Sequence, residues 1–274
     1  MYDVIGSIVL FKNKGSVVKK TVESFLATSL KVNLYIIDNS PTDYLRDMCV
    51  GENVEYIFNN RNLGFGAGHN IALGKSAGKT KYNLILNPDI YFEKGTLERI
   101  FNFMNSNKNV GSLLPKVLYP DNSLQYLCRL IPNPYDVFIR KLDIRILHPF
   151  IRNRKLRNEF RFTDYNRIMN VPYLSGCFMF IKSEVFEKIG IFDERFFLYF
   201  EDVDLARRIN EYYQTLYYPE AVIYHAYAKG SAKSLRLFMQ MILSGIKYFN
   251  KWGWFLDHKR SIANTKAINE LRYK

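Results

Sequence analysis

The chain has 274 residues, of which 48% are hydrophobic and 16% aromatic, and it carries a formal net charge of +13. This composition can bury a sizeable core and excludes an intrinsically disordered chain. The excess of positive charge predicts an acidic partner, such as a phosphorylated substrate, an anionic lipid surface or nucleic acid. Three widely separated cysteines without C-x-x-C spacing argue against a disulfide framework or zinc site and favour a reducing compartment: Cys49, Cys128 and Cys177.

The first ten residues form an apolar run that lacks a basic leader and a small-residue cleavage site. They therefore indicate a first strand rather than a signal peptide. No apolar run approaches the ~20 residues that a membrane-spanning helix needs. The sequence predicts a protein that is soluble or lies on a membrane surface.

Strand-like and helix-like segments alternate along the first part of the chain. Apolar runs predict strands at residues 4–11, 32–37, 54–58 and 82–86, and helical spacing predicts helices at 17–30, 67–76 and 96–105. This alternation predicts an α/β fold with a parallel sheet, in which ligands lie beyond the carboxyl ends of the strands. Polar residues that follow the strands are therefore candidate ligand-binding residues: Asn13, Asp38, Arg61, Asn87 and Asp89.

A glycine-rich stretch at residues 62–70 leads into the predicted helix at 67–76 and includes Gly64, Gly66 and Gly68. Close glycines let backbone N–H groups approach a phosphate, and a helix N-terminus favours negative charge. A flexible turn without a ligand is the alternative, because G-x-G alone is a weak signal. The spacing departs from the dinucleotide fingerprint, and Arg61 adds a positive charge, so we expect a nucleotide-diphosphate contact.

Residues 124–171 hold ten basic residues against four acidic ones, interleaved with apolar side chains. A basic, apolar-striped segment is typical of an element that lies on a membrane surface. The alternative is a solvated helical excursion whose apolar stripe packs on the main domain. Both are compatible, since one face can pack while the other meets phospholipid head groups.

The last part of the chain resumes strand-like composition at residues 171–181, and a final strand is expected at 214–223, followed by His225. Residues 231–249 have apolar residues at helical spacing. Trp252, Trp254 and Phe255 lie beside lysines, which suits a lipid–water interface and equally a packed C-terminal helix. We expect a domain at 1–230, with the insertion at about 122–170, and a helical extension at 231–274.

Three carboxylates, Glu201, Asp202 and Asp204, follow a run of aromatic residues at 192–200 and open a helical pattern. Acidic residues in the first turn of a helix are stabilised by its dipole and free N–H groups. Carboxylates beside buried aromatics are also what a site needs to hold a proton acceptor with a tuned pKa. The carboxylates that follow the strands are expected on one sheet edge, which favours the catalytic interpretation.

The order of these motifs resembles inverting family 2 glycosyltransferases of the GT-A fold, especially the bacterial rhamnosyltransferase-like branch. Four segments carry the resemblance: residues 34–40, 60–70, 84–89 and 192–205. It implies a Rossmann-like mixed sheet flanked by helices, with a basic helical insertion and C-terminal helices.

The resemblance also implies roles for individual residues. Asp202 matches the general base, with Glu201 beside it in the catalytic pair. Asn87-Pro88-Asp89 resembles the metal-binding D-x-D motif with Asn87 in place of the first acid, so Asp89 and His225 are the expected ligands of Mg²⁺ or Mn²⁺. Ser175 and Gly176 are expected on the acceptor side. The expected donor-binding residues are Phe11, Asn13, Asp38, Arg61, Gly64, Gly66, Asn70, Asn87 and Asp89.

The implied reaction is a single displacement that moves a sugar from a nucleotide-sugar donor to a hydroxyl of a lipid-linked saccharide in polysaccharide biosynthesis. The implied donor is dTDP-L-rhamnose. The expected location is cytoplasmic, at the anionic inner face of the plasma membrane, as a peripheral protein that can oligomerise. Two other functions fit parts of the sequence. A nucleic-acid-binding module explains the charge but not the acids, so nucleic acid is not an expected partner. A metal-dependent nucleotidyltransferase would need a second carboxylate where Asn87 stands.

Overall fold

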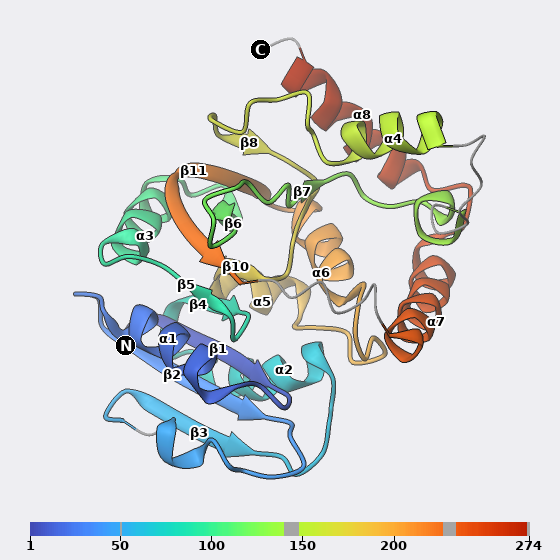
Figure 1. Cartoon of the computed structure of the whole chain (residues 1–274). Coiled ribbons are helices and arrows are strands. Elements are labelled where there is room, and N and C mark those ends of the chain that lie inside the picture. The colour runs from blue at the N-terminus through green and yellow to red at the C-terminus, as the bar shows by residue number, and fades with distance from the viewer. Residues whose placement is uncertain (50, 140–147, 227–233, 273–274) are drawn as a thin grey trace.

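The structure is a computed structural model that describes residues 1–49, 51–139, 148–226 and 234–272. Its centre is a nine-stranded mixed sheet in the order β3-β2-β1-β4-β10-β6-β11-β5, with β8 paired to β11 (Figure 1). Strands β1 to β4 are parallel to one another, and β10 runs antiparallel between β4 and β6. The strands are β1 (Tyr2–Leu10), β2 (Val32–Asp38), β3 (Val54–Phe58), β4 (Thr80–Leu86), β5 (Ile90–Tyr91), β6 (Val110–Leu118), β8 (Met169–Asn170), β10 (Phe178–Lys182) and β11 (Gln214–His225).

Helices cover both faces of the N-terminal part of the sheet, which explains why its strands are continuous apolar runs. Helix α1 (Gly15–Leu26) packs Val22 and Phe25 against one face of β1 and β2. Helix α2 (Phe65–Ser76) packs Ala72 against the other face. The remaining helices are α3 (Thr96–Ser106), α4 (His148–Asn158), α5 (Ser183–Ile189), α6 (Glu201–Asn210), α7 (Leu235–Trp252) and α8 (His258–Arg272), with short turns η1 (Arg46–Met48) and η2 (Tyr135–Ile139).

The α/β GT-A architecture expected from the sequence is confirmed, with differences at particular elements. Strand β6 is central in the sheet but is absent from the predicted strands. It contains Gly111 and Pro115, which are unfavourable in strand interiors, and its pairing with β11 is irregular beyond Tyr218. Helix α1 ends at Leu26 rather than at residue 30, and α2 begins at Phe65 rather than at residue 67.

The basic segment is only partly helical in its described residues. It contributes η2, α4, strand β8 and the strand β7 (Cys128–Arg129), which pairs with β9 (Tyr173–Leu174) in a small separate sheet. Phe160 and Tyr165 are fully buried in the main core, so part of the segment packs as the second interpretation expected. The basic residues at 140, 141 and 145 lie outside the described residues.

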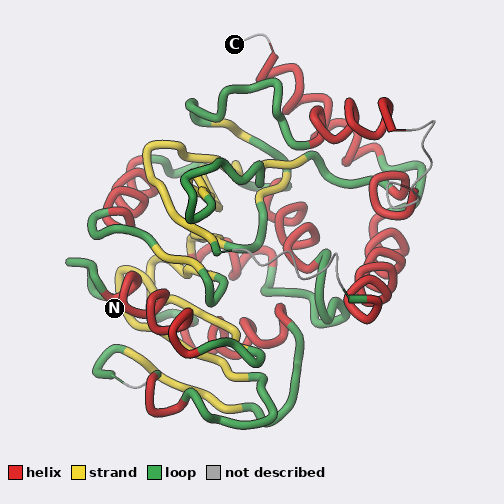
Figure 2. The backbone as a smooth tube through the Cα atoms, viewed as in Figure 1, coloured by secondary structure: helices red, strands yellow, loops and turns green. Residues whose placement is uncertain are grey.

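The two C-terminal helices pack on this chain's own core. Tyr248 and Phe249 of α7 share an apolar cluster with Phe196, Phe200 and Val203. At the start of α8, Asp257 forms a buried bidentate ion pair with Arg207 of α6, at 2.7 and 3.0 Å. Helices α4, α7 and α8 lie together at the end of the molecule away from β3 (Figure 2). No helix among the described residues combines the length and apolarity needed to cross a bilayer.

Candidate functional site

One edge of the sheet collects most of the predicted site residues. The carboxyl ends of β1, β2, β4 and β11 share this edge because these strands run in the same direction. The antiparallel strand β10 begins there. Asp38, Asn87 and His225 therefore lie at the same edge as Gly176, which precedes β10. Gly176 in turn contacts Asp202 at the start of α6.

The carboxylate of Asp202 is held by three hydrogen bonds. Its Oδ2 accepts from the Tyr173 hydroxyl at 2.8 Å and from the Gly176 amide at 2.9 Å. Its Oδ1 accepts from the amide of Val203 at 2.9 Å, in the first turn of α6. A Cβ at Gly176 would lie 2.8 Å from the Cβ of Asp202, so this approach requires glycine. The predicted acceptor residue Gly176 thus positions the predicted base.

Glu201 has a different environment from its neighbour. Its side chain is buried, and its Oε2 has no hydrogen-bond partner among the described residues. Burial, followed by the negative charge of Asp202, raises the pKa of Glu201 to about 8. Glu201 is therefore a neutral acid at neutral pH, and of the two carboxyls Asp202 is the one suited to accept a proton.

Asp204 has a structural role, because its carboxylate binds side chains of helix α7. Its buried carboxylate lies 2.6 Å from Lys251 Nζ and 2.9 Å from Arg208 Nε, and it accepts from Trp252 Nε1 at 2.8 Å. The acidic cluster thus divides into a base candidate, a neutral buried acid and a structural ion pair.

Asn87, Asp89 and His225 meet at the end of β4. His225 Nε2 lies 3.3 Å from Asp89 Oδ1 and 3.4 Å from Asn87 Nδ2. The other ring nitrogen, Nδ1, lies 3.0 Å from Gln125 Oε1. Burial by itself lowers the pKa of His225, but hydrogen bonds with Asp89 and Cys177 raise it to about 10. The predicted metal residues are brought together, and Gln125 holds the imidazole from its far side.

The predicted donor-binding residue Asp38 is fully buried. Its Oδ2 accepts from the Tyr56 hydroxyl at 2.5 Å, and its Oδ1 accepts from the Ser40 amide at 2.8 Å. Burial and the hydrogen bond to Asp38 raise the pKa of Tyr56 above its usual value. Asp38 thus fixes Tyr56 and the turn that follows β2.

The glycine stretch serves close packing. Gly64 has φ +87°, and a Cβ there would lie 2.1 Å from the carbonyl oxygen of Phe197. Its amide donates to Asn62 Oδ1 at 3.0 Å, and the next amide, of Phe65, donates to Phe197 O at 3.0 Å. A Cβ at Gly66 would contact Phe192 at 3.0 Å. Two amides expected to face a phosphate therefore already donate within the protein.

Asn70, predicted to bind the donor, forms hydrogen bonds with the loop at residues 192–200. Its Nδ2 donates to Phe192 O at 2.9 Å, and its Oδ1 accepts from the Phe192 amide at 3.0 Å. The other predicted donor residues are more open. Phe11 is 45% exposed and Arg61 is exposed, while the Oδ1 of Asn13 accepts from the Phe11 amide at 2.8 Å.

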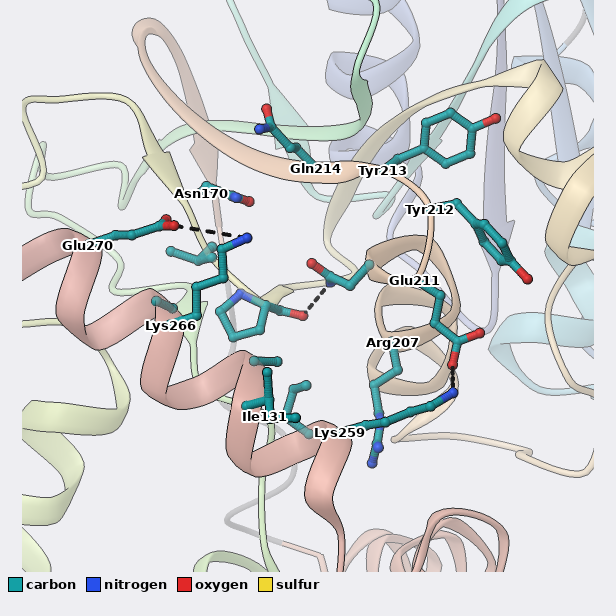
Figure 3. Close-up of a pocket in the computed structure, with 16 residues that line it drawn as sticks. Ile131, Asn170, Arg207, Glu211, Tyr212, Tyr213, Gln214, Lys259, Lys266 and Glu270 are labelled. Carbon is teal, nitrogen blue, oxygen red and sulfur yellow. Dashed lines mark hydrogen bonds and ion pairs between the residues drawn. The ribbon is translucent and has the colours of Figure 1, made fainter.

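A pocket of about 230 Å³ lies beside the acidic pair and is lined by Glu201, Asp202 and Tyr173, with Arg129 and Lys155 from the basic segment. A larger pocket of about 590 Å³ lies between α6 and α8 (Figure 3). It contains none of the predicted site residues, and polar groups on its wall are paired within the protein, such as Lys259 with Glu211 at 2.7 Å. Of these two pockets, the smaller one contains predicted site residues.

The sequence interpretation missed Tyr173, Arg129 and Gln125. Tyr173 donates to the candidate base, Arg129 lines the pocket, and Gln125 bonds His225. These residues lie in segments without a clear hydrophobic pattern. Only the folding of the chain brings them to the site. No local spacing marked them.

Known proteins resemble this chain over most of its length. The family model described as glycosyl transferase family 2 matches residues 7–190. The N-acetylglucosaminyl-diphospho-decaprenol L-rhamnosyltransferase of Mycobacterium tuberculosis is 27% identical over 85% of this chain and 79% of its own length. Rhamnosyltransferase WbbL of Escherichia coli K12 is 25% identical over 90% of each chain.

A crystal structure of GalNAc-T7 with UDP, GalNAc and Mn²⁺ superposes with a TM-score of 0.60 at 13% identity, over 82% of this chain and 43% of that one. This likeness supports the fold. The family match covers more than half of the chain and decides against the nucleic-acid and nucleotidyltransferase alternatives. The chain belongs to glycosyl transferase family 2 and is a glycosyltransferase of the rhamnosyltransferase-like branch.

Proposed function

We propose that the protein transfers L-rhamnose from dTDP-L-rhamnose to a hydroxyl of a lipid-linked saccharide, with inversion at the anomeric carbon. The observation that carries the reaction type is the bonding of Asp202. A carboxylate has about four lone-pair sites. Three are taken by Tyr173, Gly176 and Val203. One site is left for an acceptor hydroxyl at the wall of the pocket.

In the proposed mechanism Asp202 takes the proton of the acceptor hydroxyl as its oxygen attacks the anomeric carbon. Tyr173 and the Gly176 amide hold the carboxylate in place. The bond to the nucleoside diphosphate breaks in the same displacement, and positive charge must stabilise that leaving group. We assign the stabilisation of the leaving diphosphate to Arg61, which is exposed.

We propose that Asp89 and His225 would hold a divalent cation beside the donor's diphosphate. The residues fit in part. One carboxylate and one imidazole lie 3.3 Å apart, while the described residues contain no group of three or more acidic, histidine or cysteine side chains arranged to hold a metal ion. Such a cation supplies positive charge at the leaving diphosphate. Carboxylate oxygens suit Mg²⁺ and Mn²⁺, and the imidazole of His225 would bind the cation in its neutral form.

A screen of nucleotide-sugars by thermal unfolding tests the donor and the metal together. We expect dTDP-L-rhamnose with Mn²⁺ to raise the melting temperature, because a ligand at ~100 times its Kd adds ~2.7 kcal/mol of stability. The Asp89→Ala variant should lose the Mn²⁺-dependent part of this rise. Stabilisation by a different nucleotide-sugar would reject the rhamnose assignment, and an unchanged Mn²⁺ dependence in the variant would reject Asp89 as a ligand.

The proposed acceptor and the proposed cellular location are inferred from the protein surface and from the relatives. We propose that residues 1–230 form the catalytic domain, that 231–274 form a helical extension, and that both bring the pocket to the cytoplasmic face of the plasma membrane as a peripheral protein. Helix α7 carries an exposed apolar stripe of Leu235, Met239, Leu243 and Ile246 at helical spacing, with exposed Arg236 and Lys247 beside it. Phe255 and Leu256, 82% and 89% exposed, continue this apolar surface.

Flotation with liposomes tests the membrane assignment. The protein should float with vesicles that contain anionic lipid and float weakly with neutral ones, because apolar insertion and head-group attraction add. The double variant Met239→Asp with Leu243→Asp should stay at the bottom of the gradient. The matched control is Asn250→Asp, which places one negative charge on an exposed position of the same helix. Flotation of the double variant at the wild-type level would reject the α7 stripe as the contact.

A further inference from the structure

Two consecutive residues ahead of the acidic pair have an unfavourable backbone conformation. Tyr199 has φ +69° and Phe200 has φ +71°, and Glu201 and Asp202 follow directly at the start of α6. A residue with a side chain rarely adopts this left-handed conformation, and two in a row persist only where surrounding contacts hold them. The position of Asp202 therefore depends on the contacts that fix this turn.

Lys251, in the last turn of α7, bridges the two sides of the turn. Its Nζ lies 2.8 Å from Asp193 Oδ2 and 2.6 Å from Asp204 Oδ1. Asp193 precedes the turn in the chain, and Asp204 follows Asp202 by two residues in α6. One ammonium group thus closes residues 193–204 into a ring that contains the candidate base.

The bridge is not needed to neutralise the two carboxylates. Asp193 is also paired with Arg195 Nη2 at 2.5 Å, and Asp204 with Arg208 Nε at 2.9 Å. Both carboxylates would therefore keep a cationic partner if Lys251 lost its charge. What Lys251 adds is a connection between the two carboxylates.

Other contacts of α7 act on the same turn. Ser244 Oγ donates to the carbonyl oxygen of Leu198 at 2.8 Å. The ring of Phe200 packs against Tyr248, with ring centroids 5.1 Å apart. These contacts hold the middle of the turn, and the bridge joins its ends. Helix α7 thus completes the support of the candidate base.

We propose that Lys251 is a positioning residue of the transferase, which keeps the turn at residues 199–200 in the conformation that holds Asp202 at the wall of the pocket. This assignment deepens the proposed function and rests on it for the role of Asp202 as the base. It makes part of the C-terminal helical extension necessary for turnover, in addition to any contact with a membrane.

The first test is Lys251→Met, which keeps a long side chain and removes the bridge. We expect kcat to fall tenfold or more, because a misplacement of ~1 Å can lower a rate by ~10²-fold. The Kd of the donor should stay within twofold, since neither ion-pair partner of Lys251 is a predicted donor-binding residue. The matched control is Lys259→Met, which breaks an ion pair of 2.7 Å with Glu211 outside the ring and should leave kcat unchanged.

Asp193→Ala breaks the same bridge from the other side, and it decides the question if Lys251→Met fails to fold. Lys251 then keeps Asp204, and Arg195, whose side chain is 65% exposed, is released to solvent. A similar loss in kcat is expected, and the double variant should lose no more than either single variant, because both changes remove one connection. Wild-type kcat in the two single variants would overturn the proposal.

A background without the base separates positioning from general destabilisation. In Asp202→Asn, the change Lys251→Met should cause no further loss of the residual kcat, because a residue that acts through Asp202 has nothing left to position. A further tenfold loss would mean that Lys251 supports the fold in general, and would overturn the assignment. Wild-type turnover of Asp202→Asn alone would instead reject the proposed base, which is a failure of the proposed function.

Hydrogen exchange of the Gly176 amide measures the position of Asp202 without a transfer reaction. This amide donates to Asp202 Oδ2 at 2.9 Å, so its exchange is slowed while the carboxylate is in place. Lys251→Met and Asp193→Ala should accelerate this exchange tenfold or more, and Lys259→Met should leave it unchanged. Equal exchange in wild type and in both bridge variants would overturn the proposal, even if the protein transfers a sugar as proposed.

Discussion

The Asp202→Asn variant is expected to lose transfer activity by ~10²–10⁴-fold in kcat, the usual contribution of a general base. The amide cannot take the acceptor proton. Its oxygen can still accept from Tyr173 and Gly176, but its nitrogen then faces the donor amide of Val203, so a small loss of stability should accompany the change. Transfer is measured with the donor identified by thermal unfolding, and donor affinity should stay within twofold.

The control for this experiment is Tyr173→Phe, which keeps the carboxylate and removes one hydrogen bond to it. A tenfold or greater loss in kcat is expected, since a hydrogen bond to a charged group contributes ~1.5–3 kcal/mol. Wild-type turnover in Asp202→Asn would show that another group takes the proton. Glu201 would then be the first residue to examine.

Of the variants proposed here, Gly64→Ala should lower the free energy of unfolding most, by ~3–5 kcal/mol, because it combines backbone strain with a steric clash. Alanine would have to adopt φ +87°, and its Cβ would lie 2.1 Å from a backbone oxygen of Phe197, which cannot move as a side chain can. Either the glycine turn or the loop at residues 192–200 must shift. Thermal or urea unfolding measures the loss.

Gly74→Ala is the matched control for Gly64→Ala, because both glycines belong to the same stretch of chain. Gly74 lies within α2, and a Cβ there would meet no atom of the described residues within 4 Å. This variant should be neutral or gain ~0.5–1 kcal/mol, since alanine loses less entropy than glycine in a helix. Equal stability of the two variants would show that the Phe197 contact does not form.

The sequence predicted the strands β1 to β4 because helices cover both faces and make them apolar runs. It failed at β6, where Gly111 and Pro115 break the pattern although the strand is central. Tertiary pairing with β10 and β11 overrides the local preference there. The hydrophobic periodicity of the sequence predicted the order of elements, but it did not predict this central strand.

The sequence predicted which residues lie near one another at the site, but it did not predict the contacts that they make. Asp89 and His225 were placed together by the rule for strand ends, and they lie 3.3 Å apart. Gly64 and Asn70 were expected to bind the donor, which stays a prediction, and both also contact the loop at residues 192–200. The sequence shows where the glycines lie, but it does not show which backbone segment packs against them. That information is more than 120 residues away in the chain.

The contacts that join Gly64 and α2 to this loop decide which positions tolerate substitution. Gly64 meets the carbonyl oxygen of Phe197, and Asn70 bonds the amide and carbonyl of Phe192 and the carboxylate of Glu194. The partners at positions 192 and 197 are main-chain atoms, which any residue there supplies. Substitutions at position 197 should therefore be tolerated better than substitutions at positions 64 and 70, which supply the space and the side chain that these contacts need.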